Sequence, residues 1–121
     1  DVGHYITALG GFPASFIKYI NQTLTADDIL RLMQGKENRE VILRECLAYA
    51  EPSSEAVAFS SQLKAKIAIA AEGEGSSIDK VLILEGFDKP KGAYAPEVSI
   101  EYFKKNLSFY YKAAEYIGAL N

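Results

Sequence analysis

Several residue types are scarce in this chain of 121 residues, and each shortage excludes a class of protein. A single cysteine excludes a disulfide within the chain, and one histidine without cysteine or histidine partners makes no zinc site. No apolar run approaches the roughly 20 residues that a membrane-spanning helix needs. No basic segment followed by an apolar one marks a signal peptide. We therefore predict a cytoplasmic protein that does not bind a membrane.

An excess of positive charge is also missing. The chain carries 13 basic and 16 acidic residues, for a net charge of −3. Proteins that bind nucleic acids usually present a basic patch, so we predict no nucleic-acid partner. The hydrophobic content of 49% is ordinary for a globular domain, and the length predicts one domain over residues 1–121. Because the chain starts with Asp and not Met, we expect a fragment, a processed product or a trimmed form.

The most informative stretch is residues 6–18, which read Ile-Thr-Ala-Leu-Gly-Gly-Phe-Pro-Ala-Ser-Phe-Ile-Lys. The pattern predicts a strand over residues 3–9, a turn at Gly10 and Gly11, and a helix over residues 13–22. Glycine tolerates positive φ in such a turn, and Pro13 suits the first helical position. The simplest interpretation of this stretch alone is a structural strand-to-helix turn.

The rest of the chain predicts further helices and a hairpin. Thr25 is a good N-cap for a short second helix that ends near Gly35. Alternating apolar residues predict two long strands, over residues 39–50 and 55–70, joined by a turn. Residues 81–84 predict a short buried strand, and a final helix starts at Pro96 or Ser99 and runs to about 119. The acidic loop over 72–77 lacks the lysine and hydroxyl of a phosphate-binding loop. We expect an α/β (or α+β) fold, in which a mixed sheet with a long antiparallel hairpin is flanked by helices.

The predicted final helix has apolar residues on two sides. The first set, spaced by three or four residues, is expected to face the core: Ile100, Phe103, Leu107, Tyr110 or Tyr111, Ala114 and Ile117. The second set, spaced by seven, lies roughly opposite: Tyr102, Phe109 and Tyr116. Three interpretations remain open, because the helix could be sandwiched within its own domain, contact a second copy, or pack against a missing N-terminal half. We predict a dimer through the second set.

The turn also resembles a known family. Residues 8–18 follow the pattern Ala-Leu-Gly-Gly-x-Pro-x-x-(Phe/Tyr)-Ile-Lys, which is similar to the second sequence block of the inosine triphosphate pyrophosphatase family. That block opens with an acidic residue, and Asp1 falls at its place. Where the family has Gly-(Trp/Tyr)-Asp-Pro-x-Phe, residues 77–82 read Ser-Ile-Asp-Lys-Val-Leu. Residues 86–87, 94–96 and 105–106 are also similar to the family's sequence pattern.

The resemblance implies a fold and an activity. These enzymes hydrolyse non-standard purine nucleoside triphosphates, such as ITP and XTP, to the monophosphate and pyrophosphate with Mg²⁺. By position, Asp1 would be the catalytic acid and metal ligand, and Lys18, Asp79 and Lys105 would contact the nucleotide. The chain would correspond to the C-terminal two-thirds of the fold, without the N-terminal strand and loop that hold the phosphates.

Other family residues have been replaced. Residues 109–111 read Phe-Tyr-Tyr where the family has Ser-His-Arg, Lys80 replaces a proline, and Leu82 replaces a phenylalanine that stacks on the base. Two hypotheses therefore remain. The chain is a diverged nucleoside triphosphate pyrophosphohydrolase, weak or inactive in this form, or it is a catalytically dead domain that binds a partner or self-associates.

Overall fold

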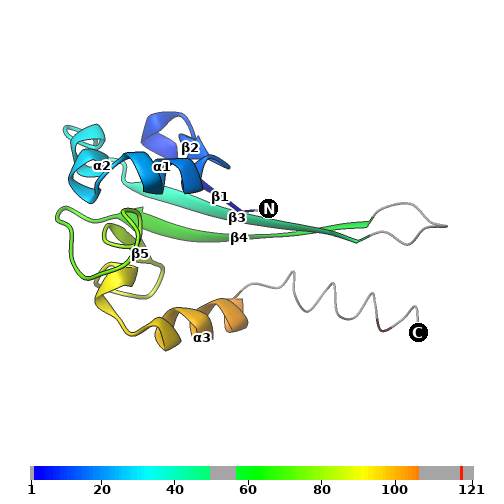
Figure 1. Ribbon diagram of the computed structural model, residues 1–121. Helices are drawn as coiled ribbons and strands as arrows, with labels where there is room; N and C mark the ends of the chain where they lie inside the picture. Colours follow the sequence, from blue (N-terminus) through cyan, green and yellow to red (C-terminus); the bar gives the residue numbers. More distant parts are fainter. Residues whose placement is uncertain (1, 50–56, 107–117, 119–121) are drawn as a thin grey trace.

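The computed structural model describes residues 2–49, residues 57–106 and residue 118. The long hairpin dominates its shape (Figure 1). Strand β3 (Glu40–Tyr49) pairs antiparallel with β4 (Val57–Ile67), from Glu40 opposite Lys66 to Tyr49 opposite Val57. Both predicted strands are thereby confirmed, each slightly shorter than expected.

Shorter strands extend the hairpin on both sides. Strand β1 (Val2–Ile6) pairs with β3, and the two-residue β2 (Pro13–Ala14) pairs with β1. On the other side, β5 (Leu82–Leu84) pairs with β4. The strand order in the described residues is β2-β1-β3-β4-β5, and every pairing is antiparallel.

Five helical segments accompany the sheet in the described residues. Helices α1 (Ile17–Thr23) and α2 (Ala26–Leu32) lie beside β1 and β3, whereas α3 (Pro96–Asn106) lies beyond β5 (Figure 1). The short 3-10 helix η1 (Thr7–Leu9) follows β1, and a second one, η2 (Lys91–Ala93), precedes α3. The predicted α/β (or α+β) fold with a long hairpin and flanking helices is confirmed, but the sheet of the described residues is antiparallel throughout and not mixed as predicted.

One face of the sheet forms the core with these helices. Side chains alternate along a strand, so one face of β1, β3, β4 and β5 supplies a continuous apolar layer. Residues of α1, α2 and the segment before β5 close over it. The buried cluster contains Ile6, Ile17, Ile29, Met33, Val41, Leu43, Ala65, Ile67, Ile78, Val81, Leu82 and Leu84.

The predicted start of the first helix is wrong. Pro13 does not open a helix, because it pairs with Tyr5 in β2, after a cis Phe12–Pro13 peptide bond. The helix begins four residues later, at Ile17. The strand prediction for residues 3–9 is also too long, since the chain turns into η1 at Thr7. Gly10 and Gly11 do adopt positive φ values of 68° and 94° in the turn that follows.

The second helix begins as predicted. The Thr25 hydroxyl accepts a hydrogen bond from the N–H of Asp28 (3.1 Å), and the Asp28 carboxylate accepts one from the N–H of Thr25 (2.9 Å). This reciprocal capping box satisfies two N–H groups that have no partner within the helix. Its hydrogen bonds lower the pKa of Asp28. Gly35 follows the helix with a φ of 78°.

The end of the second long strand and two orientations on the last helix were predicted wrongly. The sheet pairing of β4 ends at Ile67, short of the predicted end at residue 70, and Ile69 beyond it is 81% exposed. On α3, Ile100 was assigned to the core and is 54% exposed. Tyr102, assigned to the opposite side, packs against the core and meets the ring of Phe87 edge-on at 5.3 Å. Phe109 and Tyr116 lie outside the described residues.

Candidate functional site

A groove of about 750 Å³ lies between two loops and the start of α3. The first loop, residues 72–80, leads into β5, and the second, residues 89–95, contains η2. Apolar walls come from Tyr94, Ile100 and Phe103, and the charged side chains at its surface are Glu74, Asp79 and Lys91. Its volume lies within the range of about 300–1,000 Å³ that small-molecule sites usually have.

Two glycines let these loops meet backbone to backbone. A Cβ atom on Gly73 would lie 2.1 Å from the carbonyl carbon of Gly92, and one on Gly92 would lie 2.2 Å from the carbonyl oxygen of Glu74. No side chain fits at either position. The N–H of Glu74 donates to the oxygen of Gly92 (2.9 Å), and the N–H of Gly92 donates to the oxygen of Asp79 (2.7 Å). These close contacts and the two backbone hydrogen bonds form a clamp, which fixes the spacing of the groove walls.

The polar centre of the groove is an ion pair across this clamp. The Lys91 ammonium donates to Oδ1 of Asp79 at 3.1 Å, while the N–H of Ser76 donates to Oδ2 at 3.2 Å. The Lys91 ammonium also lies 5.6 Å from the centroid of the Phe103 ring, within the range of a cation–π contact. About a quarter of each charged side chain remains exposed, 28% for Lys91 and 25% for Asp79. A ligand in the groove can therefore reach both.

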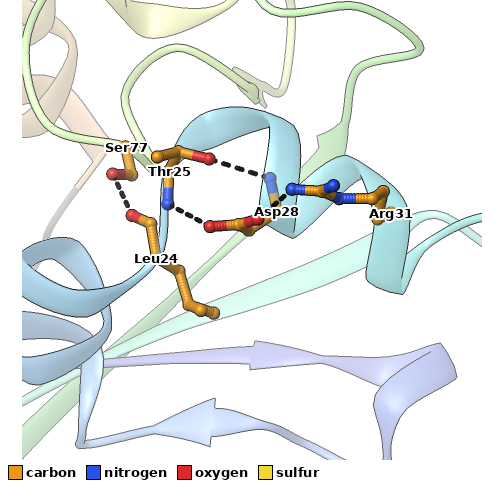
Figure 2. Close-up of polar contacts among 5 residues, drawn as sticks. All are labelled: Leu24, Thr25, Asp28, Arg31 and Ser77. Carbon is orange, nitrogen blue, oxygen red and sulfur yellow. Dashed lines mark hydrogen bonds and ion pairs between the residues drawn. The ribbon is translucent and has the colours of Figure 1, made fainter.

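The loop that carries Asp79 is anchored to the helices on its other side. Asn21 of α1 accepts a hydrogen bond from the N–H of Ile78 through its side-chain oxygen, at 3.1 Å. The hydroxyl of Ser77 donates to the carbonyl oxygen of Leu24, just before the capped start of α2 (Figure 2). Ile78 is buried, at 4% exposure, and it lines a small apolar cavity with Phe12 and Pro13. The next residue, Asp79, then faces the groove.

The half-buried His4 of β1 is electrostatically coupled to the ion pair. Burial, and then the positive charge of Lys91, lower its pKa from 6.5 to about 4, although the charge of Asp79 acts in the opposite direction. Its Nδ1 atom is buried and has no hydrogen-bond partner in the described part of the chain. The imidazole is therefore neutral at ordinary pH, and the site carries no charge from it.

Comparison with known proteins identifies the family. The sequence model of the Ham1 family matches residues 1–116. The chain belongs to the Ham1 family. Among its relatives, a dITP/XTP pyrophosphatase of Methanopyrus kandleri is 36% identical over 89 residues, which are 73% of this chain and 47% of that protein. One of Thermococcus kodakarensis is 34% identical over 90 residues, covering 74% of this chain and 48% of that protein.

A solved structure confirms the fold. The crystal structure of a nucleoside-triphosphatase/dITP/XTP pyrophosphatase from Mycobacterium abscessus superposes with a TM-score of 0.74, at 19% identity. The match covers 88% of this chain and 60% of that one. The chain thus spans about half the length of the curated relatives that it matches. The inosine triphosphate pyrophosphatase resemblance of the sequence agrees with these Ham1 relatives.

The structure places only some of the site residues predicted from the sequence at the groove. Asp79 lines the groove, whereas Lys18 of α1 and Lys105 of α3 are exposed and do not line it. Lys105 pairs with Glu101 at 3.2 Å. The turn at Gly10 and Gly11 does not line the groove either. Asp1 lies outside the described residues.

Lys91 is the site residue that sequence reasoning missed. It lies in a loop with Lys89 and Pro90, twelve residues after Asp79, and nothing in that spacing predicts an ion pair. Tyr94 and Phe103 were likewise not predicted to line a site. The glycines at 73 and 92 were the available signal, because closely packed loops often need glycine.

The described residues do not fit a Mg²⁺ site. This ion prefers oxygen ligands in an octahedral arrangement, and carboxylates usually supply one or two of them. No group of three or more His, Cys, Asp or Glu residues in the described ranges could hold a metal ion. The carboxylate of Asp79 is already engaged by Lys91 and Ser76.

In the described segments, no helix is long and apolar enough to cross a bilayer.

Proposed function

We propose that this chain forms the nucleoside-binding part of a Ham1-type pyrophosphohydrolase, which converts non-standard purine nucleoside triphosphates to monophosphate and pyrophosphate. The observation that carries the proposal is the groove in which Asp79 and Lys91 present a carboxylate and an ammonium beside the aromatic side chains of Tyr94 and Phe103. The Methanopyrus and Thermococcus relatives are dITP/XTP pyrophosphatases, which supports the substrate class.

The charges of the groove favour the nucleoside over the phosphates. Glu74 and Asp79 against Lys91 leave one net negative charge among its charged lining residues. A triphosphate would be repelled there, whereas an uncharged base can pack on apolar walls and hydrogen-bond to the ion pair. In this proposal the base occupies the groove and the phosphates point out of it.

Hydrolysis needs more than the groove supplies. Attack on a triphosphate requires groups that hold the phosphates and stabilise their developing charge. We propose that Mg²⁺ takes part with Asp1 as a ligand, and that Lys18 and Lys105 lie toward the nucleotide. These roles rest on the resemblance. The proposal extends to a cytoplasmic location and to a homodimer through Phe109 and Tyr116, without Tyr102, which packs against the core.

Pyrophosphate release tests the proposed activity. ITP, XTP, dUTP and ATP would be incubated with Mg²⁺, using the 121-residue chain and the longest natural chain that contains it. We expect little or no turnover by the former and turnover of ITP and XTP by the latter. Asp79→Asn should raise KM for ITP in the longer chain, whereas Asp27→Asn, on the exposed surface of α2, should not. An unchanged KM in Asp79→Asn would contradict the assignment of the groove.

A second candidate function is a catalytically inactive domain that binds nucleotides or protein partners. The ion pair favours it, because Lys91 neutralises Asp79, one of the two acidic residues that line the groove. The same assay distinguishes the two. Binding of ITP without pyrophosphate release, in the longest natural chain, would support the inactive domain.

A further inference from the structure

We propose that a second cavity, between α2 and the end of β4, binds a small monocarboxylate with an apolar body, such as an aliphatic acid. The cavity has a volume of about 560 Å³, which lies within the usual range of small-molecule sites. None of the residues that line it also lines the groove around Asp79. The inference therefore goes beyond the proposed function and does not depend on it.

The half-buried guanidinium of Arg39 supplies the positive end of this cavity. Its Nε and Nη2 atoms donate to the carbonyl oxygens of Ile67 and Ala68, each at 2.7 Å, and Nη1 donates to the oxygen of Lys36 at 3.4 Å. Three of its five N–H groups are thus used, and two remain. These contacts hold the planar group in place, so it is preorganised for two parallel hydrogen bonds to a carboxylate.

The charge of Arg39 has no acidic partner in the described part of the chain. The ion pairs there involve Arg31, Lys91 and Lys105, and none reaches Arg39. The neutral carbonyl oxygens around Arg39 offer hydrogen bonds but no negative charge. A half-buried cation in this state favours an incoming anion, because the anion restores the interaction with opposite charge.

The floor of the cavity is apolar. Met33 is buried and Leu30 is half-buried, whereas Ile69 is 81% exposed on the solvent side. An aliphatic chain that lies on this floor would remove its own surface and that of Ile69 from water. Each CH₂ group so buried contributes roughly 0.8 kcal/mol, the figure for complete burial.

The far end of the cavity disfavours a second negative charge. Asp27 lies in the first turn of α2, whereas Arg39 contacts the loop that follows the helix. The seven residues of α2 separate these charges by about 10 Å. Arg31 also lines the cavity, but Asp28 pairs with it and its side chain is 71% exposed. A monocarboxylate therefore fits the charges better than a dicarboxylate of the same length.

Four small probes test the inference on the unaltered, ¹⁵N-labelled chain at pH 7.5. Hexanoate has the carboxylate and the chain, hexan-1-ol lacks the charge, acetate lacks the chain, and adipate adds a second carboxylate. We expect hexanoate to shift the amides of Gln34, Gly35 and Ile69, which line the cavity. It should bind about ten-fold more tightly than hexan-1-ol and acetate, and about three-fold more tightly than adipate.

Two variants assign the contacts to this cavity. Ile69→Ser, at a mostly exposed position, should weaken hexanoate binding at least three-fold, whereas Phe16→Ser, at the 69% exposed position on α1, should leave it unchanged. Arg39→Gln should abolish the preference for hexanoate over hexan-1-ol. Equal affinity for these two probes in the unaltered chain would overturn the inference. Hexanoate that leaves the three cavity amides unmoved, up to its solubility limit, would also overturn it, and neither result would affect the proposed function.

Discussion

The side-chain oxygen of Asn21 accepts a hydrogen bond from the backbone N–H of Ile78, 3.1 Å away, and this contact ties helix α1 to the loop that presents Asp79. The two residues are 57 positions apart in the chain. The buried side chain of Ile78 and the bond from Ser77 to Leu24 reinforce the same junction. The helices thereby determine which way Asp79 faces.

Removing the acceptor should weaken this junction. In Asn21→Leu the N–H of Ile78 loses its partner, and we expect the free energy of unfolding to fall by about 1–3 kcal/mol in urea denaturation. Asn21→Asp keeps an acceptor oxygen and should lose less. The matched control is Gln22→Leu, at the exposed neighbouring position. Equal stability of Asn21→Leu and Gln22→Leu would show that the bond contributes nothing.

The contact between Gly73 and Gly92 should not tolerate a side chain. A Cβ atom on Gly92 would lie 2.2 Å from the backbone oxygen of Glu74, so Gly92→Ala must push the two loops apart. We expect a loss of about 2 kcal/mol or more in the free energy of unfolding. Gly118→Ala is the control, because its Cβ meets no atom of the described residues within 4 Å. A Gly92→Ala chain as stable as the control would refute the clamp.

Replacing Ala14 by glycine should raise the free energy of unfolding. It is the non-glycine residue of the described chain with a positive φ, at 56°, where a Cβ atom is disfavoured. Ala14→Gly relieves that strain, and we expect a gain of about 1 kcal/mol in thermal or urea unfolding. Ala58→Gly, in the exposed part of β4, should instead lose about 0.5–1 kcal/mol. A loss in Ala14→Gly equal to that in Ala58→Gly would contradict the backbone conformation.

His4 should make stability depend on pH. Its pKa is about 4 in the folded chain and 6.5 without burial, so between these values the unfolded chain binds more protons. The free energy of unfolding therefore falls as pH falls through this window and is flat above it. Between pH 7.5 and pH 5.0 we expect a loss of about 2 kcal/mol in urea unfolding.

His4→Leu is the matched test of that pH effect. This variant should be about equally stable at both values, because it removes the titrating imidazole. Glu45, whose pKa is raised by burial, acts in the opposite direction, and at pH 5.0 most carboxylates remain ionised. The same pH dependence in His4→Leu as in the unaltered chain would assign it to another group.

Local chemistry made much of the fold predictable. The capping box at Thr25 needs only residues close in sequence, and the alternation of β4 follows from a repeat of two. Errors arose where distant contacts decide. Pro13 was assigned to a helix, but it pairs with Tyr5 of β1. The alternation of apolar residues in β4 continues to Ile69, but the strand ends at Ile67. There the side chain of Arg39 donates hydrogen bonds to the carbonyl oxygens of Ile67 and Ala68, each at 2.7 Å.

The candidate site was less predictable than the fold. Asp79 came from the resemblance to the pyrophosphatase family, and the structure places it in the groove. Lys91 could not be found in this way, because its contact with Asp79 depends on two loops that meet through glycine backbones. On α3, the spacing of apolar residues could not tell Ile100 from Tyr102, since both belong to plausible stripes. The ring of Phe87 decides between them.

The central claim is that the groove around Asp79 and Lys91 receives the base of a nucleotide. Amide NMR spectra of the ¹⁵N-labelled chain, recorded during titration with inosine, test it most directly. The account predicts that the largest shift changes fall on Gly75, Asp79, Gly92 and Tyr94, which line the groove. Changes confined to α1 around Lys18, with these four amides unmoved, would contradict it.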